Sequence, residues 1–231
     1  MRLGIIGSSG GAAISAAVAC IKDAKKSLDV VVATDRECGV LTWAKRQNYQ
    51  ATLIPYVDAL SFSTAALGHF ESSNVDCVLL FYTRLLAAPL LGGLPVYNIH
   101  PSLLPCFRGL NSLRQALNAK TRIIGATLHV VSDELDAGSI VAQICSGLPS
   151  IDAMVIAEKI SYLQKIYLTL LLYELMTDFG MTIEKATNNL IFKAPPPHST
   201  NASPCLTDFA LVRSFDSLQK RERCDIVNWQ F

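Results

Sequence analysis

The sequence predicts an α/β fold in which a doubly wound, mostly parallel sheet forms a single domain. Short apolar runs of strand length alternate with helical segments along most of the chain, and this rhythm is typical of βαβ units. Of the 231 residues 51% are hydrophobic and only 17% are charged, a composition that suits strands buried on both faces. A chain of this length can also bury a substantial core.

The first predicted strand, residues 3–6, leads into a glycine-rich turn, which in turn leads into an alanine-rich segment at residues 12–21 with strong helix propensity. Further apolar strand-like runs are expected at residues 29–34, 51–55, 77–81, 95–99, 123–131 and 139–144. Further helices are expected at residues 40–48, 62–72, 111–119 and 152–179. For the last of these, Ser150 is a candidate N-cap and Gly180 a candidate C-terminal stop.

The carboxyl-terminal part carries weaker patterns. Residues 181–193 resemble a hairpin, and residues 194–204 lack periodicity and are typical of a loop or linker. A short helix is expected at residues 217–223. We therefore assign residues 1–193 to a catalytic domain and residues 194–231 to a linker and tail whose role the sequence does not indicate.

Composition excludes several classes of protein. The net charge is +1, with Lys and Arg scattered, so no basic surface argues for nucleic acid. Seven widely spaced cysteines without a C-x-x-C pair indicate reduced thiols in a cytoplasmic protein and no metal site. The apolar segment around residues 166–176 is interrupted by Thr169, Tyr173 and Glu174, which predicts a core helix and no membrane span. We expect a monomer or homodimer.

The glycine-rich turn is a candidate anion site. Ser8, Ser9, Gly10 and Gly11 lie between the first strand and the first helix, where free backbone N–H groups and the helix dipole favour a phosphate. The alternative is a tight turn without a ligand. The turn lacks the G-x-G-x-x-G pattern, so a nicotinamide cofactor is not expected.

Polar side chains follow the strand at residues 95–99. Asn98 and His100 are two positions apart, so both leave an extended backbone on the same face. Residues directly after a strand lie at the edge of the sheet where ligands bind. Asp136 follows in a later loop. Taken singly, such residues often form turns, satisfy a backbone carbonyl or close a loop.

Three phrases contain these residues: NIHPSLLP at 98–105, GATLHVV at 125–131 and DELDAG at 133–138. In this order and spacing they resemble the folate-dependent formyltransferase family, over roughly residues 1 to 180. The resemblance implies a Rossmann-like fold and transfer of a formyl group from 10-formyltetrahydrofolate, the co-substrate, to a primary amine of a small phosphorylated molecule. Glycinamide ribonucleotide, an intermediate of de novo purine synthesis, is the leading candidate, and no metal is implied.

By this resemblance, Asn98, His100 and Asp136 match the family's catalytic residues, and the transfer is direct, without an acyl-enzyme. Formyl transfer passes through a tetrahedral oxyanion, so hydrogen-bond donors and a route for the amine proton are needed. The residues that match the folate-binding walls are Arg84, Leu85, Leu86, Val131, Asp133, Glu134 and Leu135. His129 matches a family histidine, for which a structural role is favoured over a catalytic one. Cys106 is expected to be an inert thiol.

The acceptor side departs from the family pattern. Ala12 and Ala13 stand where family members that use glycinamide ribonucleotide carry an Asn, Phe81 stands for a Gly, and Gln164 corresponds to a substrate-facing Glu. Other activities therefore stay open: an amino-sugar nucleotide N-formyltransferase, a formyltetrahydrofolate hydrolase, or a catalytically degenerate folate-binding relative. The hydrolase normally has an additional amino-terminal domain, for which this chain offers no room. A methionyl-tRNA formyltransferase is disfavoured, because this tail is short and mixed in charge.

Overall fold

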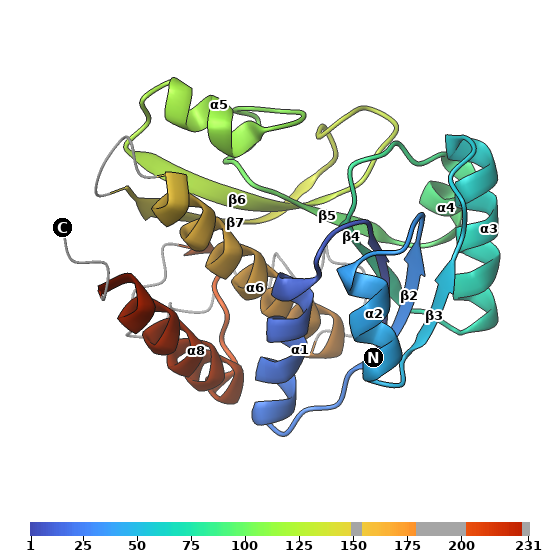
Figure 1. The fold of residues 1–231 in the computed structure, drawn as a ribbon, viewed down its shortest axis with the longest axis horizontal. Helices are drawn as coiled ribbons and strands as arrows, with labels where there is room; N and C mark the ends of the chain where they lie inside the picture. The colour runs from blue at the N-terminus through green and yellow to red at the C-terminus, as the bar shows by residue number, and fades with distance from the viewer. Residues whose placement is uncertain (149–153, 179–201, 228–231) are drawn as a thin grey trace.

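A computed structural model of the protein describes residues 1–148, 154–178 and 202–227, with side chains described up to residue 222. The strands are β1 (Arg2–Gly7), β2 (Asp29–Thr34), β3 (Gln50–Leu53), β4 (Cys77–Phe81), β5 (Val96–His100), β6 (Ile123–Val130), β7 (Ile140–Gly147) and β8 (Ala202–Ser203). The helices are α1 (Ala12–Asp23), α2 (Gly39–Arg46), α3 (Ala59–Ser72), α4 (Ala88–Gly93), α5 (Ser112–Asn118), α6 (Met154–Asp178) and α8 (Phe209–Val227). Within the described ranges the strands form one eight-stranded sheet in the order β3-β2-β1-β4-β5-β6-β7-β8 (Figure 1).

The sheet confirms the predicted α/β class and its mostly parallel arrangement. Strands β1 to β5 pair in parallel, whereas β6, β7 and β8 continue the sheet in antiparallel pairing. The chain starts in the middle of the sheet, builds outward through β2 to β3, and then crosses to β4 on the other side of β1. Ligands of such sheets bind at the carboxyl ends of the strands where this change of direction occurs.

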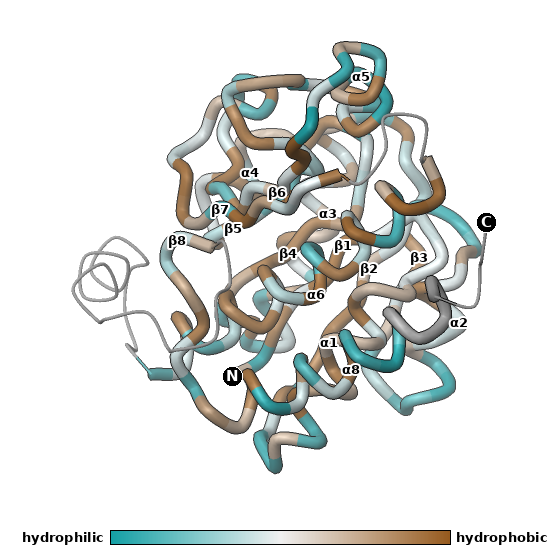
Figure 2. The backbone as a smooth tube through the Cα atoms, turned by 90° about the vertical axis from the view of Figure 1, so that its left-hand side faces the viewer, coloured by the Kyte–Doolittle hydropathy of each residue, from teal (hydrophilic) through white to brown (hydrophobic). Residues whose placement is uncertain are grey.

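Alternate residues of the strands face opposite sides of the sheet and form separate cores. In β1, Leu3 and Ile5 pack with α1, α2, α6 and α8, whereas Ile6 packs with α3 and α4. In β2, Val30 belongs to the first core and Val31 to the second. Because both faces are buried, these strands carry unbroken apolar runs, and Figure 2 shows apolar residues concentrated along the central strands.

Helix α6 is a core helix, as the sequence predicts. Residues 166–175 are all buried, and their polar groups have partners. The Thr169 hydroxyl donates to the carbonyl of Lys165 (2.8 Å), and the Tyr173 hydroxyl donates to the carbonyl of Ser27 (3.0 Å). Of the helices that the structure describes, none is long and apolar enough to cross a membrane.

Helix α4 is not predicted by the sequence. Its six residues, APLLGG, carry a proline in the first turn and end in two glycines, so the pattern is too short to be distinguished from a turn. Strand β8 lies in the segment that the sequence assigns to a loop, where it pairs with β7. The predicted hairpin at 181–193, the caps Ser150 and Gly180 and most of the 194–204 loop lie outside the described residues.

Helix α8 starts at Phe209 and is longer than the predicted helix at 217–223. Its first turn is capped by Asp208, whose carboxylate accepts hydrogen bonds from the N–H groups of Ala210 and Leu211, both at 3.0 Å. An Asp at this position is a common helix start signal. Apolar residues of α8 then complete the core beside α1 and α6.

The segment between β8 and α8 is fixed to α6 by a buried carboxylate. Glu174 is 1% exposed and accepts hydrogen bonds from the N–H groups of Thr207 (2.9 Å) and Asp208 (3.0 Å) and from the Thr207 hydroxyl. The N–H of Leu206 donates to the Tyr167 hydroxyl oxygen (2.7 Å). Burial raises the pKa of Glu174, because the ionised carboxylate loses hydration there.

Replacing Glu174 by Gln should change how stability depends on pH. A raised pKa means that the folded protein holds this proton more tightly than the unfolded chain, in which the pKa of Glu is about 4.3. The stabilisation linked to this proton is therefore fully present below that pH and is lost as pH rises through the raised value. Urea denaturation from about pH 4 to pH 8 should show wild type losing stability relative to Glu174→Gln.

The exposed Glu71 on α3 provides the control, because Glu71→Gln removes a carboxylate that is in contact with solvent. Its difference from wild type should stay nearly constant over the same range. If the free energy of unfolding of wild type instead rose relative to that of Glu174→Gln as pH increases, the raised pKa of Glu174 would be contradicted.

Candidate active site

Strands β5 and β6 place four polar side chains on one face of the sheet. In their antiparallel register, Asn98 lies opposite His129 and His100 lies opposite Thr127. Directly opposite residues point to the same face, and Asn98 and His100 share a face because they are two apart. The pairing brings Nδ2 of Asn98 to 3.2 Å from Nε2 of His129.

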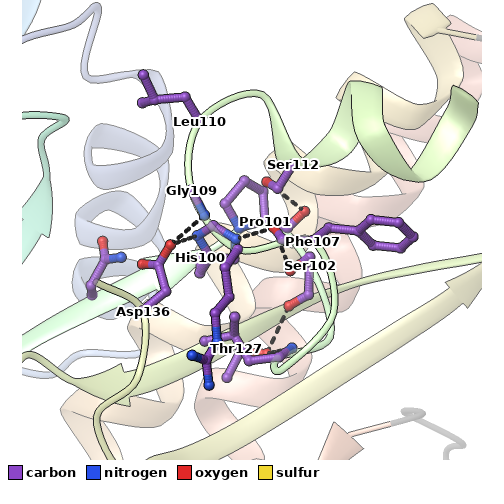
Figure 3. Close-up of polar contacts among 12 residues, drawn as sticks. His100, Pro101, Ser102, Phe107, Gly109, Leu110, Ser112, Thr127 and Asp136 are labelled. Carbon is purple, nitrogen blue, oxygen red and sulfur yellow. Dashed lines mark hydrogen bonds and ion pairs between the residues drawn. The ribbon is translucent and has the colours of Figure 1, made fainter. Parts of the chain in front are cut away.

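The loop after β5 is held by Thr127 and folds back over His100. The Thr127 hydroxyl donates to the carbonyl of Ser102 (2.7 Å) and accepts from the N–H of Leu104 (3.0 Å). Gln143 on β7 adds hydrogen bonds to the carbonyl of Leu104 (2.9 Å) and to the Thr127 hydroxyl oxygen (3.0 Å). This buried polar network, which the sequence analysis did not identify, fixes the path of the loop above the strand end (Figure 3).

Both ring nitrogens of His100 face oxygen acceptors. Nε2 lies 2.8 Å from the carbonyl oxygen of Phe107, and Nδ1 lies 3.3 Å from Oδ2 of Asp136 (Figure 3). A carbonyl only accepts, so Nε2 carries a proton, and Nδ1 faces the carboxylate. His100, which is 4% exposed, is therefore held in a fixed orientation by acceptors at both ring nitrogens.

Asp136 is presented by the loop that follows β6. Its φ of 51° lies in the left-handed region, which costs energy for a residue other than glycine. The N–H of Gly109 donates to Oδ2 of Asp136 (2.8 Å) and helps to hold this conformation. At Gly138 an added Cβ would lie 1.8 Å from the carbonyl oxygen of Val130. Only glycine therefore lets the loop pack this closely against the end of β6.

His129 determines the orientation of the Asn98 amide. Its Nδ1 lies 2.9 Å from the carbonyl oxygen of Val130, so Nδ1 carries the proton. Burial lowers the pKa of His129. This effect is larger than the opposing effect of the Asp136 carboxylate, whose Oδ1 lies 3.7 Å from Nε2 and which raises the pKa. The neutral ring accepts at Nε2 from one amide N–H of Asn98, which leaves the second N–H for a ligand.

These side chains line a cavity of about 580 Å³, a size found for small-molecule sites. Every residue that the sequence assigns to folate binding also lines it, namely Arg84, Leu85, Leu86, Val131, Asp133, Glu134 and Leu135. Leu85, Leu110 and Leu135 are each more than half exposed there. Leu110 was not identified from the sequence. Three exposed leucines around one cavity suit a flat, largely apolar ligand.

The Arg84 side chain is anchored at one side of this cavity. Its Nε lies 2.8 Å from the Asp35 carboxylate, and its guanidinium lies 4.5 Å from the centre of the Tyr56 ring. Asp35 also accepts from Arg36 (2.6 Å), and this hydrogen bond holds the pKa of Asp35 below its ordinary value despite burial. Two guanidinium groups thus share one buried carboxylate, which leaves excess positive charge beside the cavity.

A second cavity, of about 370 Å³, is lined by the glycine-rich turn at residues 9–11 and by α6. Gly11 has a φ of 75°, and an added Cβ would lie 2.9 Å from the Val40 side chain, so this position requires glycine. Ser8 lines the first cavity instead. Its N–H donates to the carbonyl of Phe81 (3.2 Å) and is not available to an anion.

Helix α6 presents Lys165, and not Gln164, to the cavities. Gln164 is 2% exposed, and its amide nitrogen lies 3.2 Å from the Ser146 hydroxyl and 3.4 Å from the carbonyl of Ile124. Gln164, which corresponds to a substrate-facing Glu of the family, therefore faces β6 and β7 and does not line either cavity. Successive helical residues are rotated by about 100°, and Lys165, one position further, lines both cavities.

Within the described residues, no group of three or more His, Cys, Asp or Glu could hold a metal ion. The described cysteines are free thiols, and Cys106 is exposed in the loop after β5.

The sequence model of one protein family, described as formyl transferase, matches residues 2–164. The human trifunctional purine biosynthetic protein adenosine-3 is 30% identical over 151 residues, which cover 62% of this chain and 15% of that protein. Formyltetrahydrofolate deformylase 2 from Arabidopsis thaliana is 47% identical over 68 residues, which cover 29% of this chain and 21% of that protein. The chain therefore spans only a small part of these relatives.

The fold is similar to that of glycinamide ribonucleotide transformylase 1 from Symbiobacterium toebii. The two structures superpose with a TM-score of 0.72 and 27% sequence identity, over 78% of this chain and 88% of the other. Because the family match ends inside α6, most of that helix and α8 lie beyond it.

Replacing Gly138 by Ala should displace the Asp136 loop. The added methyl group would clash with the carbonyl of Val130, and because this group belongs to the backbone, the clash can be relieved only by a shift of the main chain. We expect loss of the contact between His100 and Asp136 together with a lower free energy of unfolding, on the order of 1–3 kcal/mol. Imidazole ¹⁵N chemical shifts of His100 would follow the loss of this contact, and urea denaturation would follow stability.

Gly68→Ala is the matched control for this substitution. Gly68 lies in helix α3 with nothing within 4 Å of an added Cβ, and alanine favours helix formation. Its spectra should resemble those of wild type. Unchanged His100 resonances in Gly138→Ala would show that the loop does not depend on this close packing.

Proposed function

The chain belongs to the formyl transferase family, and from this premise we propose that the protein transfers a formyl group from 10-formyltetrahydrofolate to the primary amine of a small phosphorylated acceptor. Glycinamide ribonucleotide is the leading acceptor, because the trifunctional purine biosynthetic protein and the S. toebii transformylase are among its relatives. The observation that carries the proposal is the convergence of Asn98, His100 and Asp136 on one cavity.

Asn98 is proposed to stabilise the oxyanion that forms when the amine attacks the formyl carbon. One amide N–H is held by His129, so the second is oriented in advance and needs no rearrangement at the moment of reaction. An oriented donor of this kind acts where negative charge develops and is among the largest single contributions to enzymatic rates.

His100 and Asp136 are proposed to supply electrostatic stabilisation and a proton route. The ring of His100 stabilises the developing negative charge, and Asp136, whose Oδ2 lies 3.3 Å from Nδ1, orients that ring. Asp136 is the carboxylate that accepts the proton of the attacking amine, directly or through a water, before the proton passes to the leaving nitrogen. Attack of the amine forms the new C–N bond and the tetrahedral oxyanion, and the C–N bond to the folate then breaks as the proton reaches the leaving nitrogen. No side chain is acylated.

The two cavities fit the two substrates. In the first cavity, the exposed leucines suit a bicyclic ring system, and the guanidinium of Arg84 suits an acidic tail. The co-substrate bound there supplies the formyl carbonyl. The second, beside residues 9–11 at the start of α1, suits the phosphate of the acceptor, because free N–H groups and the helix dipole favour anions there.

The proposed function is tested by mixing the protein with 10-formyltetrahydrofolate and candidate amines and recording the absorbance of released tetrahydrofolate. Release that depends on the amine supports formyl transfer. The identity with the Arabidopsis deformylase favours a hydrolase as the second candidate, and release in the absence of any amine would select it. No release under either condition would overturn both activities.

Asn98→Ala should lower kcat by about 10²–10³-fold, because it removes an oxyanion donor. The affinity for the folate co-substrate should stay nearly unchanged, since the donor acts mainly in the transition state. Steady-state kinetics with binding measured by calorimetry would separate the two. Asn118→Ala, at the exposed end of α5, provides the control, and a full rate in Asn98→Ala would remove Asn98 from catalysis.

A further inference from the structure

The wall between the two cavities is formed by a small set of residues. Those that line both cavities are Ser9, Phe81, Pro101, Leu113 and Lys165. An acceptor held in the second cavity must pass this wall for its amine to reach Asn98 and His100 in the first. Of these shared residues, only Lys165 carries a charge, so it places an ammonium group at the point where the two cavities meet.

The Lys165 ammonium lacks a counter-charge in the described part of the chain. Two other partly buried lysines have close carboxylate partners: Lys26 pairs with Asp208 at 2.6 Å, and Lys159 pairs with Glu222 at 2.6 Å. For Lys165 the structure gives a bond only to its backbone carbonyl. The residue is only partly exposed, and a half-buried cation without a partner is a costly arrangement that an anionic ligand would relieve.

Among the described residues, none of the carboxylates that line the cavities forms a salt bridge with Lys165. Glu158 lines the second cavity from α6 but is solvent-exposed and lies two helical turns away. In the first cavity, Asp136 accepts from Gly109 and faces His100. Glu134 pairs with Arg108, and Asp133 is exposed. Within the ranges that the structure describes, the Lys165 ammonium is therefore unpaired where the two cavities meet.

Resting on the function proposed above, we propose that Lys165 is a specificity-determining residue that makes this site select acceptor amines carrying an anionic group, such as a phosphate monoester. The ammonium attracts that group across a wall from which water is partly excluded, where charge pairs are stronger than in bulk solvent.

The environment of Lys165 agrees with this role. Burial lowers the pKa of its ammonium, because the charged form is poorly hydrated there. A bound anion would compensate for that loss and draw the pKa back toward its ordinary value. The side chain is thus better satisfied with an anionic acceptor than without one.

The test compares glycinamide ribonucleotide with its dephosphorylated riboside as acceptors for wild type and Lys165→Met. Charge-assisted bonds contribute enough to change affinity by about 10- to 100-fold. We expect Lys165→Met to raise KM for the phosphorylated acceptor by about that factor, with kcat and the KM for 10-formyltetrahydrofolate changed by less than about threefold. KM for the riboside should barely change.

Two control variants separate charge from structure. Lys165→Arg keeps a cation and should retain most of the preference for the phosphorylated acceptor. Lys45→Met removes one positive charge from an exposed site on α2, where the side chain is 61% exposed and lines neither cavity. It should leave both KM values unchanged, which would exclude an effect of net charge alone.

Calorimetric binding of both acceptors in the absence of the folate tests the inference independently of turnover. A wild-type preference for the phosphorylated acceptor that is lost in Lys165→Met supports the role of Lys165, even if no tetrahydrofolate is released and the proposed activity fails. An equal preference in wild type and Lys165→Met, or no preference in wild type, would overturn the inference while leaving formyl transfer to be judged by its own assay.

Discussion

The antiparallel pairing of β5 with β6 is the constraint on which the candidate site depends. Had the sheet continued in parallel, Asn98 would not face His129 in direct register. The reversal puts two histidines and an amide on one face and returns the chain over them, so Asp136 can reach both rings. One change of strand direction therefore assembles groups that are distant in the sequence.

Buried charge is the main cost of this arrangement, and the protein compensates for it with paired partners. Asp136 is held by a backbone N–H and by His100, Asp35 by two guanidinium groups, and Glu174 by the backbone at the start of α8. Each carboxylate is satisfied by donors of the correct kind, as burial of a charge requires. Lys165 differs, because it faces the cavities and none of the described residues supplies such a partner.

The architecture separates the two ends of the proposed reaction. The first cavity lies against the carboxyl ends of β4 and β5 and has exposed leucines around it, whereas the second lies between the start of α1 and the face of α6. Phe81 and Lys165 form part of the wall between them. Differences in the acceptor among related proteins can thus arise at this wall without disturbing Asn98 or His100.

The α/β class, the order of most strands and helices, and the short phrases that contain Asn98, His100 and Asp136 follow from the sequence, because strand periodicity and local motifs are properties of neighbouring residues. Features that depend on the phase of a helix or the register of a sheet are defined by the folded chain alone. Helix phase turned Gln164 toward β6 and β7 and Lys165 toward the cavities. The register of β5 and β6 pairs Asn98 with His129. The packing of α8 depends on the capping residue Asp208 and on Glu174, which is distant in the sequence. Contacts between distant residues produce no periodic pattern, so they cannot be predicted from the sequence.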